Sequence, residues 1–223
     1  MSINLLLDNA NPLEWEQWHE SGLFKGITTN PSLLKEASQH CTISNLLDLS
    51  LKAERLGYKE LHIQAWGKEA SDMYDCGLSI SKLSNQNLRI YVKLPLTLEG
   101  SKAAKMLNQS NIPITFTACY KVKQVLIATS LGAHYIAPYL GRINDKGLDG
   151  NKEIKRMQKV LSGIRSTCQI LVASIRSSND ICDLATVGIK TFTISPKLAK
   201  EIYHCEETLE AIKKFEIDLN SNI

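Results

Sequence analysis

The sequence predicts an α/β protein built as a single (β/α)8 barrel, a TIM barrel, followed by one extra C-terminal helix. Short β-rich runs alternate with helix-type patterns along all 223 residues, with roughly one strand per 28 residues. No Pro/Gly/Ser-rich linker, charge run or low-complexity stretch interrupts this alternation, which favours one domain over two. We therefore assign residues 1–205 to the barrel and residues 206–223 to the additional helix and tail.

Eight short runs rich in β-branched and aromatic residues are the predicted strands. They are Ile3–Asp8, Gly26–Asn30, Tyr58–Gln64, Leu88–Leu94, Ile112–Ala118, His134–Tyr139, Gln169–Ser174 and Ile189–Ser195. A doubly wound sheet is the alternative, but it usually has fewer strands and a glycine-rich phosphate-binding turn after the first one. The sequence Asp8-Asn9-Ala10-Asn11 is not such a turn.

The gaps between the predicted strands carry helix signals in chain order. Asn11-Pro12 combines an N-cap residue with a proline in the first turn, Gly22 ends that helix, and Asn30-Pro31 begins the second. Later helices are indicated by apolar residues at helical spacing, in segments 42–57, 73–83, 122–132, 154–164 and 181–188. The last segment, Glu206–Leu219, has an apolar face and no strand after it.

Composition and charge exclude several classes of protein. Hydrophobic residues make up 43% and charged residues 22%, which is typical of a globular chain rather than a disordered or collagen-like one. Because 26 Lys+Arg face 23 Asp+Glu, the net charge is only +3, and neither nucleic acid nor a membrane is indicated as a partner. The N-terminus MSINLLLDN resembles no signal peptide, so we expect a cytoplasmic protein.

Cysteine and histidine spacing predicts no disulfide framework and no metal site. The six cysteines lie 14 to 49 residues apart without a CxxC pair, which indicates reduced, mostly buried thiols. The five histidines form no HExxH or HxH pattern.

Polar residues lie at the ends of the predicted strands, where barrels of this kind build their active sites. The residues of interest are Asp8, Thr28, Asn30, Gln64, Lys93, Thr117, Tyr139, Arg142, Ser174 and Arg176. Since the strands are parallel, these side chains are expected to share one rim of the barrel.

Lys93 is the most informative of them, because its strand, Ile90–Pro95, is otherwise apolar. A lone lysine there is usually one whose amine reaches back to solvent at the end of a strand. The alternative is a lysine whose pKa is lowered by burial, so that the neutral amine can attack a carbonyl and form a Schiff base. The neighbouring residues decide between these interpretations.

Several of those neighbours also allow both a structural and a functional interpretation. Asp8 could cap a turn, Asn30 is placed to cap the helix that follows it, and Tyr139 could be a rim aromatic or an acid/base group. Gln64 can hold a water or a hydroxyl without adding charge near Lys93.

Arg142, Ser174 and Arg176 follow the sixth and seventh predicted strands, the sector where such barrels commonly bind phosphate. Either arginine alone would more often form a surface ion pair, but two guanidiniums and a hydroxyl together suit a phosphate dianion. A buried lysine and a phosphate site on one rim indicate a sugar-phosphate enzyme that works through an imine.

At this point the residues resemble a known family. The segments are Gly26-Ile27-Thr28-Thr29-Asn30-Pro31-Ser32, Tyr91-Val92-Lys93-Leu94-Pro95-Leu96-Thr97, Ala137-Pro138-Tyr139-Leu140-Gly141-Arg142-Ile143 and Ala173-Ser174-Ile175-Arg176. In this order they are similar to motifs of the transaldolase family, whose short members include both transaldolases and fructose-6-phosphate aldolases. The resemblance covers nearly the whole chain and implies a TIM barrel with Lys93 as the Schiff-base lysine.

The resemblance also bears on which reaction is catalysed. Gln64, Tyr139 and the segment Thr117–Tyr120 are similar to the aldolase type, since transaldolases usually carry glutamate and phenylalanine at the first two positions. Arg176 is instead similar to the transaldolase type. Fructose 6-phosphate cleavage is therefore the first expectation. Dihydroxyacetone transfer in the pentose phosphate pathway is the alternative, and an inactive phosphate-binding barrel is a minor one.

By the same resemblance each predicted site residue receives a role. Catalytic roles fall to Lys93, Tyr139, Asp8, Gln64 and Thr117, and substrate-binding roles to Asn30, Thr28, Ser174, Arg142 and Arg176. No cofactor and no metal are expected, and the partners are small sugar phosphates and other copies of the chain. The C-terminal helix would pack on a neighbouring subunit in a pentamer or decamer, whereas without the resemblance it would be read as a helix folded over its own barrel.

Overall fold

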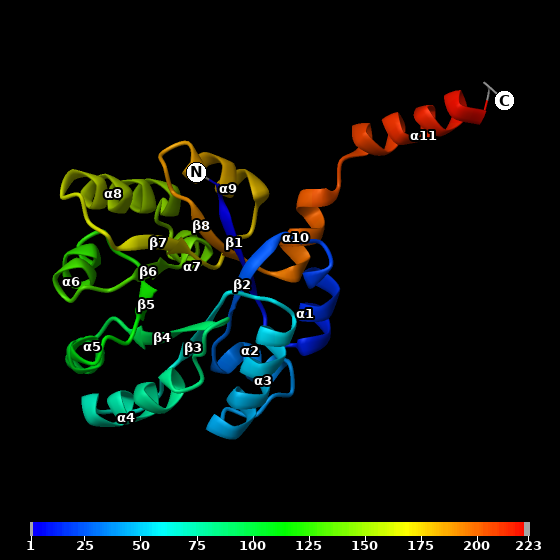
Figure 1. The fold of residues 1–223 in the computed structure, drawn as a ribbon. Coiled ribbons are helices and arrows are strands. Elements are labelled where there is room, and N and C mark those ends of the chain that lie inside the picture. The colour runs from blue at the N-terminus through cyan, green and yellow to red at the C-terminus, as the bar shows by residue number, and fades with distance from the viewer. Residues whose placement is uncertain (1, 221–223) are drawn as a thin grey trace.

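The computed structural model describes residues 2–220, so the predicted tail at 221–223 lies outside the described residues. Eight parallel strands close into a barrel in the order β1 to β8, with β8 pairing back onto β1 (Figure 1). The predicted (β/α)8 fold is confirmed.

Every predicted strand is present, with ends that differ by a few residues. The strands are β1 Asn4–Asp8, β2 Phe24–Thr28, β3 Glu60–Gln64, β4 Arg89–Pro95, β5 Ile114–Cys119, β6 Tyr135–Pro138, β7 Gln169–Val172 and β8 Thr191–Ile194. The register places Gln64 beside Lys93 and Lys93 beside Thr115, so side chains from neighbouring strands meet inside the barrel.

Helices alternate with the strands and surround the barrel. They are α1 Pro12–His19, α2 Pro31–Glu36, α3 Ile43–Arg55, α4 Ala70–Ser81, α5 Leu98–Gln109, α6 Gln124–Ser130, α7 Leu140–Asp145, α8 Gly150–Gly163, α9 Ser178–Ala185, α10 Pro196–Tyr203 and α11 Glu206–Asn220. The predicted caps are confirmed, because the Asn11 side chain accepts from the Leu13 N–H and that of Asn30 from the Leu33 N–H. Gly22 follows α1 with a φ of +64°, a conformation that costs glycine little.

Strand residues alternate between two environments. One side of each strand packs under the helices in a large core that includes Leu7, Ile27, Val92 and Ile136. The other side faces the barrel interior, where Leu6, Tyr91, Tyr135, Ala137 and Leu171 form a separate cluster. Inward-facing positions therefore form layers, and the last layer meets the rim at the C-terminal ends of the strands.

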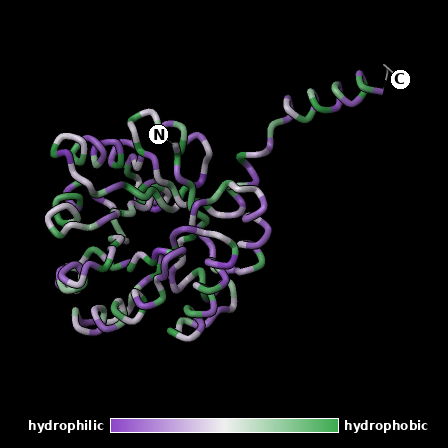
Figure 2. Tube along the Cα trace, in the orientation of Figure 1, coloured by the Kyte–Doolittle hydropathy of each residue, from purple (hydrophilic) through white to green (hydrophobic). Residues whose placement is uncertain are grey.

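Helix α11 differs from every other helix because none of its residues is buried. It extends away from the barrel, and hydrophobic segments recur along its length (Figures 1 and 2). The side chains of Leu209, Ile212 and Phe215 are 45% to 62% exposed. The alternative that α11 folds over its own barrel is therefore wrong for residues 206–220. No helix within residues 2–220 is long and apolar enough to cross a membrane.

The expectation of mostly buried cysteines is also wrong. All six thiols are free, but only Cys119 and Cys168, next to the sheet, are buried. Cys41, Cys182 and Cys205 are exposed, because each lies in a loop or on the outer side of the helical layer.

Candidate active site

A cavity opens at the C-terminal ends of the strands, where barrels of this kind place their active sites. Its lining residues come from six strands or the loops after them. They are Asp8, Thr28, Asn30, Lys93, Ala137, Tyr139, Arg142, Leu171, Ala173, Ser174 and Thr193. Seven of the ten sequence-predicted site residues therefore meet around one space.

Lys93 reaches this cavity from inside the barrel. Its side chain is 6% exposed, and Nζ donates a 2.7 Å hydrogen bond to the carbonyl oxygen of Thr29. Burial lowers the pKa of Lys93 from 10.5 to about 8, although the negative charge of Asp8 opposes that shift. A substantial fraction of the Lys93 amines is thus neutral slightly above neutral pH. A neutral amine is the form that adds to a carbonyl.

Asp8 is the carboxylate that faces Lys93. Burial raises its pKa, while the Lys93 charge and the Thr28 hydroxyl oppose the increase. Thr28 Oγ1 donates to Asp8 Oδ1 at 2.7 Å and lies 2.5 Å from Thr193 Oγ1. These hydroxyls hold the carboxylate in one orientation, so Asp8 can exchange a proton with a group bound beside Lys93.

Gln64 lies next to Lys93 on the neighbouring strand and Thr117 contacts Gln64, but neither lines the cavity. Gln64 Nε2 donates to the carbonyl oxygen of Lys93 at 3.0 Å, and Thr117 Oγ1 donates to Gln64 Oε1 at 3.3 Å. The amide is thereby oriented with its nitrogen toward the β4 backbone and its oxygen toward β5. This pair supports the rim between β3 and β5.

Tyr139 and Arg142 form one wall of the cavity. The Arg142 guanidinium lies 4.8 Å from the centre of the Tyr139 ring, and the Tyr120 ring meets Tyr139 edge-on at 5.8 Å. Tyr139 is thus held between a cation and a second aromatic ring. Its phenol belongs to the residue just before α7, at the mouth of the cavity.

Ser174 and Asn30 complete the rim with polar groups. Ser174 has a φ of +57°, a left-handed conformation that is uncommon for serine and often marks functional sites. Its neighbour in space, Arg142, provides the positive charge of this sector. Asn30 has two roles, since its side chain both caps α2 and lines the cavity.

Arg176 is not where the sequence places it. Its guanidinium donates to both carboxylate oxygens of Asp145, at 2.6 and 2.5 Å, and does not line the cavity. The bidentate geometry explains the difference, because a carboxylate satisfies the planar fork as well as a phosphate does.

Sequence reasoning missed three contributors. Thr193 lines the cavity from β8, the Thr29 carbonyl accepts from Lys93, and Asp145 binds Arg176. Thr193 could have been found from the alternation in Thr191-Phe192-Thr193, which puts two hydroxyls on the inner side. No comparable signal exists for a backbone carbonyl.

The donor set of the cavity suits organic and phosphate groups. Among residues 2–220, no three His, Cys, Asp or Glu side chains lie close enough together to hold a metal ion. Arg142 and Ser174 could bind a phosphate, and the Lys93 amine could form a bond to a carbonyl carbon.

Comparison with known proteins identifies the family of this chain. The sequence profile described as Transaldolase/Fructose-6-phosphate aldolase matches residues 5–223. The chain belongs to the transaldolase/fructose-6-phosphate aldolase family. Similar relatives include a probable transaldolase of Maricaulis maris (strain MCS10), 31% identical and covering 97% of this chain and 96% of the relative. A probable transaldolase of Chelativorans sp. (strain BNC1) is 30% identical with the same coverage of both chains.

Solved structures similar to this chain support the fold only. A mandelate oxidase structure with an FMN adduct superimposes with a TM-score of 0.61 at 11% identity, and another with (S)-mandelic acid gives 0.60. In both, the match covers 86% of this chain and 64% of the mandelate oxidase chain. This likeness concerns the barrel and not its chemistry.

Membership of the transaldolase/fructose-6-phosphate aldolase family supports an enzyme with aldolase or transaldolase activity. Small sugar phosphates are the class of substrate that the family name indicates.

Proposed function

We propose that this protein is a class I, Schiff-base-forming aldol enzyme that reversibly cleaves fructose 6-phosphate to dihydroxyacetone and glyceraldehyde 3-phosphate. The observation that carries the proposal is Lys93, a buried amine whose pKa is lowered to about 8 at the base of a cavity. Asp8 lies in the same cavity, and Arg142 with Ser174 provides a phosphate site there.

In the first step the neutral amine of Lys93 attacks C2 of the ketose. The carbinolamine then loses water to give a protonated imine, which withdraws electrons from the C3–C4 bond. Asp8 supplies and removes protons at this stage, and Asn30 holds hydroxyl groups of the dihydroxyacetone portion. Phosphate binding by Arg142 and Ser174, with Arg176 added, positions the reacting bond from the far end of the substrate.

In the second step a base removes the proton of the C4 hydroxyl and the C3–C4 bond breaks. The electron pair of that bond goes to C3, so glyceraldehyde 3-phosphate leaves and an enamine of dihydroxyacetone stays on Lys93. Tyr139, which lines the cavity, is the acid/base group, and the water through which it acts connects it with Gln64 and Thr117 just outside the lining. Protonation of C3 and hydrolysis of the imine then release dihydroxyacetone and restore the amine.

The second candidate function is transaldolase activity. In that reaction the enamine on Lys93 attacks an aldose phosphate such as erythrose 4-phosphate, which gives sedoheptulose 7-phosphate instead of free dihydroxyacetone. Arg176 and the relatives named probable transaldolase favour this function. Gln64 and Tyr139 favour the aldolase function, and both reactions share every step up to the enamine.

Two measurements test these proposals in turn. Borohydride reduction in the presence of fructose 6-phosphate, followed by peptide mass mapping, is expected to place an adduct on Lys93. An unmodified Lys93 would reject both reactions. Free dihydroxyacetone release is then compared with transfer to erythrose 4-phosphate, and transfer without release would reject the aldolase function.

Tyr139→Phe addresses the choice of reaction at the residue level. The variant keeps the ring between Arg142 and Tyr120 but loses the phenol hydroxyl. We expect cleavage to fall by roughly 10²-fold, the lower range for loss of an acid/base group, while transfer is retained or gained. Tyr120→Phe is the matched control, because it removes a hydroxyl from the adjacent ring.

We also propose that the enzyme is cytoplasmic and that it assembles as a homo-oligomer, a pentamer or decamer, through α11. The exposed apolar residues of α11 support this proposal, since an apolar helix face that is exposed on one chain can be buried against another. Size-exclusion chromatography of a chain that ends before Glu206 tests it. If the shortened chain assembles with the same number of subunits, α11 is not the contact between them.

A further inference from the structure

The phosphate sector contains an anion that the proposed mechanism does not use. Asp145 is the last residue of α7, and its carboxylate accepts from both Nη atoms of Arg176. The Arg176 guanidinium and, more weakly, Arg142 hold the pKa of Asp145 below its usual range, so the carboxylate is ionised at neutral pH. One internal anion therefore lies beside two of the cations predicted to bind substrate phosphate.

The path of the Arg176 side chain explains how it can serve two partners. It crosses α7 at Gly141, where an added Cβ would lie 2.8 Å from Arg176 Nε and 2.6 Å from the Ser174 carbonyl oxygen. The Gly141 N–H donates to that same carbonyl at 2.8 Å. Because glycine leaves this crossing open, Arg176 lies directly against the backbone of Gly141, which is hydrogen-bonded to Ser174, and the Ser174 side chain lines the cavity.

The Asp145 carboxylate and a substrate phosphate differ in charge and in position. Asp145 presents a single negative charge on a side chain that is 49% exposed, outside the cavity. A substrate phosphate carries up to two negative charges and would lie at Arg142 and Ser174, next to the Gly141 crossing. An exposed ion pair is weak, so the Asp145 contact can be exchanged for a dianion at small cost.

We propose that Asp145 is a positioning residue that holds Arg176 outside the cavity, competes with the substrate phosphate for it, and so sets the affinity for phosphorylated substrates. The inference rests on the proposed function only in taking the substrate to carry a phosphate. In the absence of ligand, Arg176 stays on Asp145. When a phosphate binds at Arg142 and Ser174, Arg176 leaves Asp145 and joins it.

Asp145→Asn tests the competition, since it removes the charge and keeps the shape. Rates of aldol addition of dihydroxyacetone are compared for glyceraldehyde 3-phosphate and for glyceraldehyde, which lacks only the phosphate. We expect the KM for glyceraldehyde 3-phosphate to fall about threefold with kcat unchanged, and no change for glyceraldehyde. If Asp145 instead only clamps α7 to the β7–α9 loop, its loss would raise KM for both aldehydes.

Arg176→Gln and the double variant test whether Asp145 acts through Arg176. Arg176→Gln is expected to raise the KM for glyceraldehyde 3-phosphate roughly tenfold. Adding Asp145→Asn to it should change that KM by less than about twofold, because the group under competition is gone. A full threefold fall in the double variant would show simple charge repulsion and overturn the proposal. Glu16→Gln, which removes the carboxylate paired with Lys52 on α3, is the matched charge control.

Calorimetric titration with inorganic phosphate separates this inference from the proposed function. If the enzyme turns over neither aldehyde but inorganic phosphate binds about threefold more tightly to the Asp145→Asn variant, the competition stands and the proposed reaction fails. If turnover is normal and neither KM nor phosphate affinity changes in that variant, the reaction stands and the competition is rejected.

Discussion

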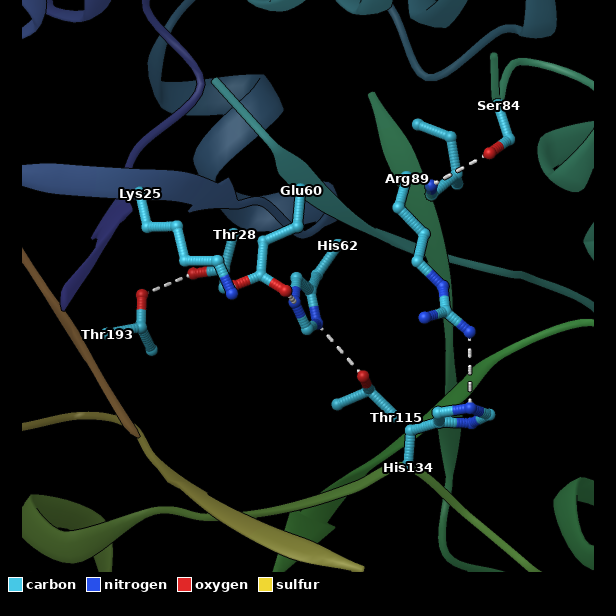
Figure 3. Close-up of polar contacts among 10 residues, drawn as sticks. Lys25, Thr28, Glu60, His62, Ser84, Arg89, Thr115, His134 and Thr193 are labelled. Atoms are coloured by element: carbon cyan, nitrogen blue, oxygen red, sulfur yellow. Dashed lines mark hydrogen bonds and ion pairs between the residues drawn. The ribbon is translucent and has the colours of Figure 1, made fainter. Parts of the chain in front are cut away.

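The barrel interior contains two neighbouring clusters of polar side chains, most of them buried, and one of these clusters lines the cavity. The upper cluster, defined by Lys93, Asp8, Thr28 and Thr193, lies at the C-terminal ends of the strands and lines the candidate active site. The lower cluster, defined by Lys25, Glu60, His62 and Thr115, lies nearer the N-terminal ends of β2 to β5 (Figure 3). Each cluster contains a carboxylate and an amine, so such a pair alone does not identify a site.

In the lower cluster, contacts between its own members partly balance the buried charge, although Glu60 Oε1 and His62 Nε2 make no hydrogen bond. Glu60 is 3% exposed and lies 3.5 Å from Lys25 Nζ and 3.9 Å from His62 Nε2. His62 Nδ1 lies 2.9 Å from Thr115 Oγ1, and the imidazole stacks on the Tyr91 ring at 4.5 Å. Contacts with His62 and Lys25 lower the pKa of Glu60, although burial opposes this.

The two clusters differ in how the charge of a buried side chain is balanced by its neighbours. Burial lowers the pKa of Lys93, and Asp8 compensates only in part, whereas Glu60 has a cation on the surface of the barrel as partner. A poorly compensated lysine beside a cavity is destabilising, and it persists where it has a function. We therefore expect changes in the upper cluster to affect catalysis and changes in the lower cluster to affect folding.

Lys93→Met should have the largest effect. It removes the amine that forms the imine, so turnover of fructose 6-phosphate is expected to fall on the order of 10⁴-fold or more. Folding should be retained, since a buried cation is replaced by an apolar side chain of similar length. Steady-state rates and thermal denaturation measure the two properties. Turnover within tenfold of the wild type would remove Lys93 from the mechanism, and unfolding of the variant would end the contrast between the clusters.

His62→Phe makes the corresponding change in the lower cluster. The phenyl ring can still stack on Tyr91, but Thr115 loses a buried hydrogen-bonding partner and Glu60 loses the imidazole 3.9 Å from its carboxylate. We expect the free energy of unfolding to fall by about 2 kcal/mol, with kcat per folded molecule within about twofold. Denaturant unfolding and active-site titration by borohydride trapping measure these quantities. A large loss of kcat in a folded variant would place His62 in the catalytic machinery.

The two clusters should also respond to pH in different ranges. Because neutral Lys93 is the nucleophile and its pKa is about 8, kcat/KM is expected to rise about tenfold per pH unit below 8 and to level off above it. The pH dependence of borohydride trapping with dihydroxyacetone checks this assignment. A flat profile between pH 6 and 9 would contradict it.

Stability should also depend on pH, because burial lowers the pKa of both Lys93 and His62 in the folded chain. The pKa of Lys93 is lower in the folded chain, so the unfolded chain binds more protons between pH 8 and 10.5, and stability rises with pH in that window. Burial also lowers the pKa of His62 below 6.5, so its contribution is present above pH 6.5 and is lost as the pH falls further. In Lys93→Met the alkaline rise should disappear while the acid loss remains.

Much of the fold could be predicted from the sequence because its signals are local. Strands appear as short β-rich runs, and caps such as Asn11-Pro12 mark helix starts. Helix α10 begins with the same signal, Ser195-Pro196, but no separate helix is predicted between the eighth strand and Glu206. Helix α7 has six residues, too few for a helical period to be recognised.

The candidate site was predictable where it depends on strand ends and not where it depends on contacts between distant segments. Lys93, Asp8 and Ser174 were found because parallel strands bring their C-terminal ends to one rim. The position of Arg176 depends on Asp145, which lies 31 residues earlier in the chain and has no motif to mark it. The lower cluster was missed because Glu60 and His62 lie before the C-terminal end of their strand, where no catalytic pattern is expected.

Thr193→Val should have the smallest effect and tests how far the upper cluster depends on its outer members. The Thr193 hydroxyl touches Thr28 but not Asp8, and Thr28 keeps its 2.7 Å hydrogen bond to Asp8 Oδ1. Loss of one hydrogen bond of about 1 kcal/mol corresponds to roughly a fivefold fall in kcat, with the pH profile unchanged. Thr191→Val, one layer lower on β8, is the matched control and should leave kcat unaltered. Equal effects of the two variants would contradict a specific role of Thr193, because a change below the cavity would then reach Asp8 as readily as a change beside it.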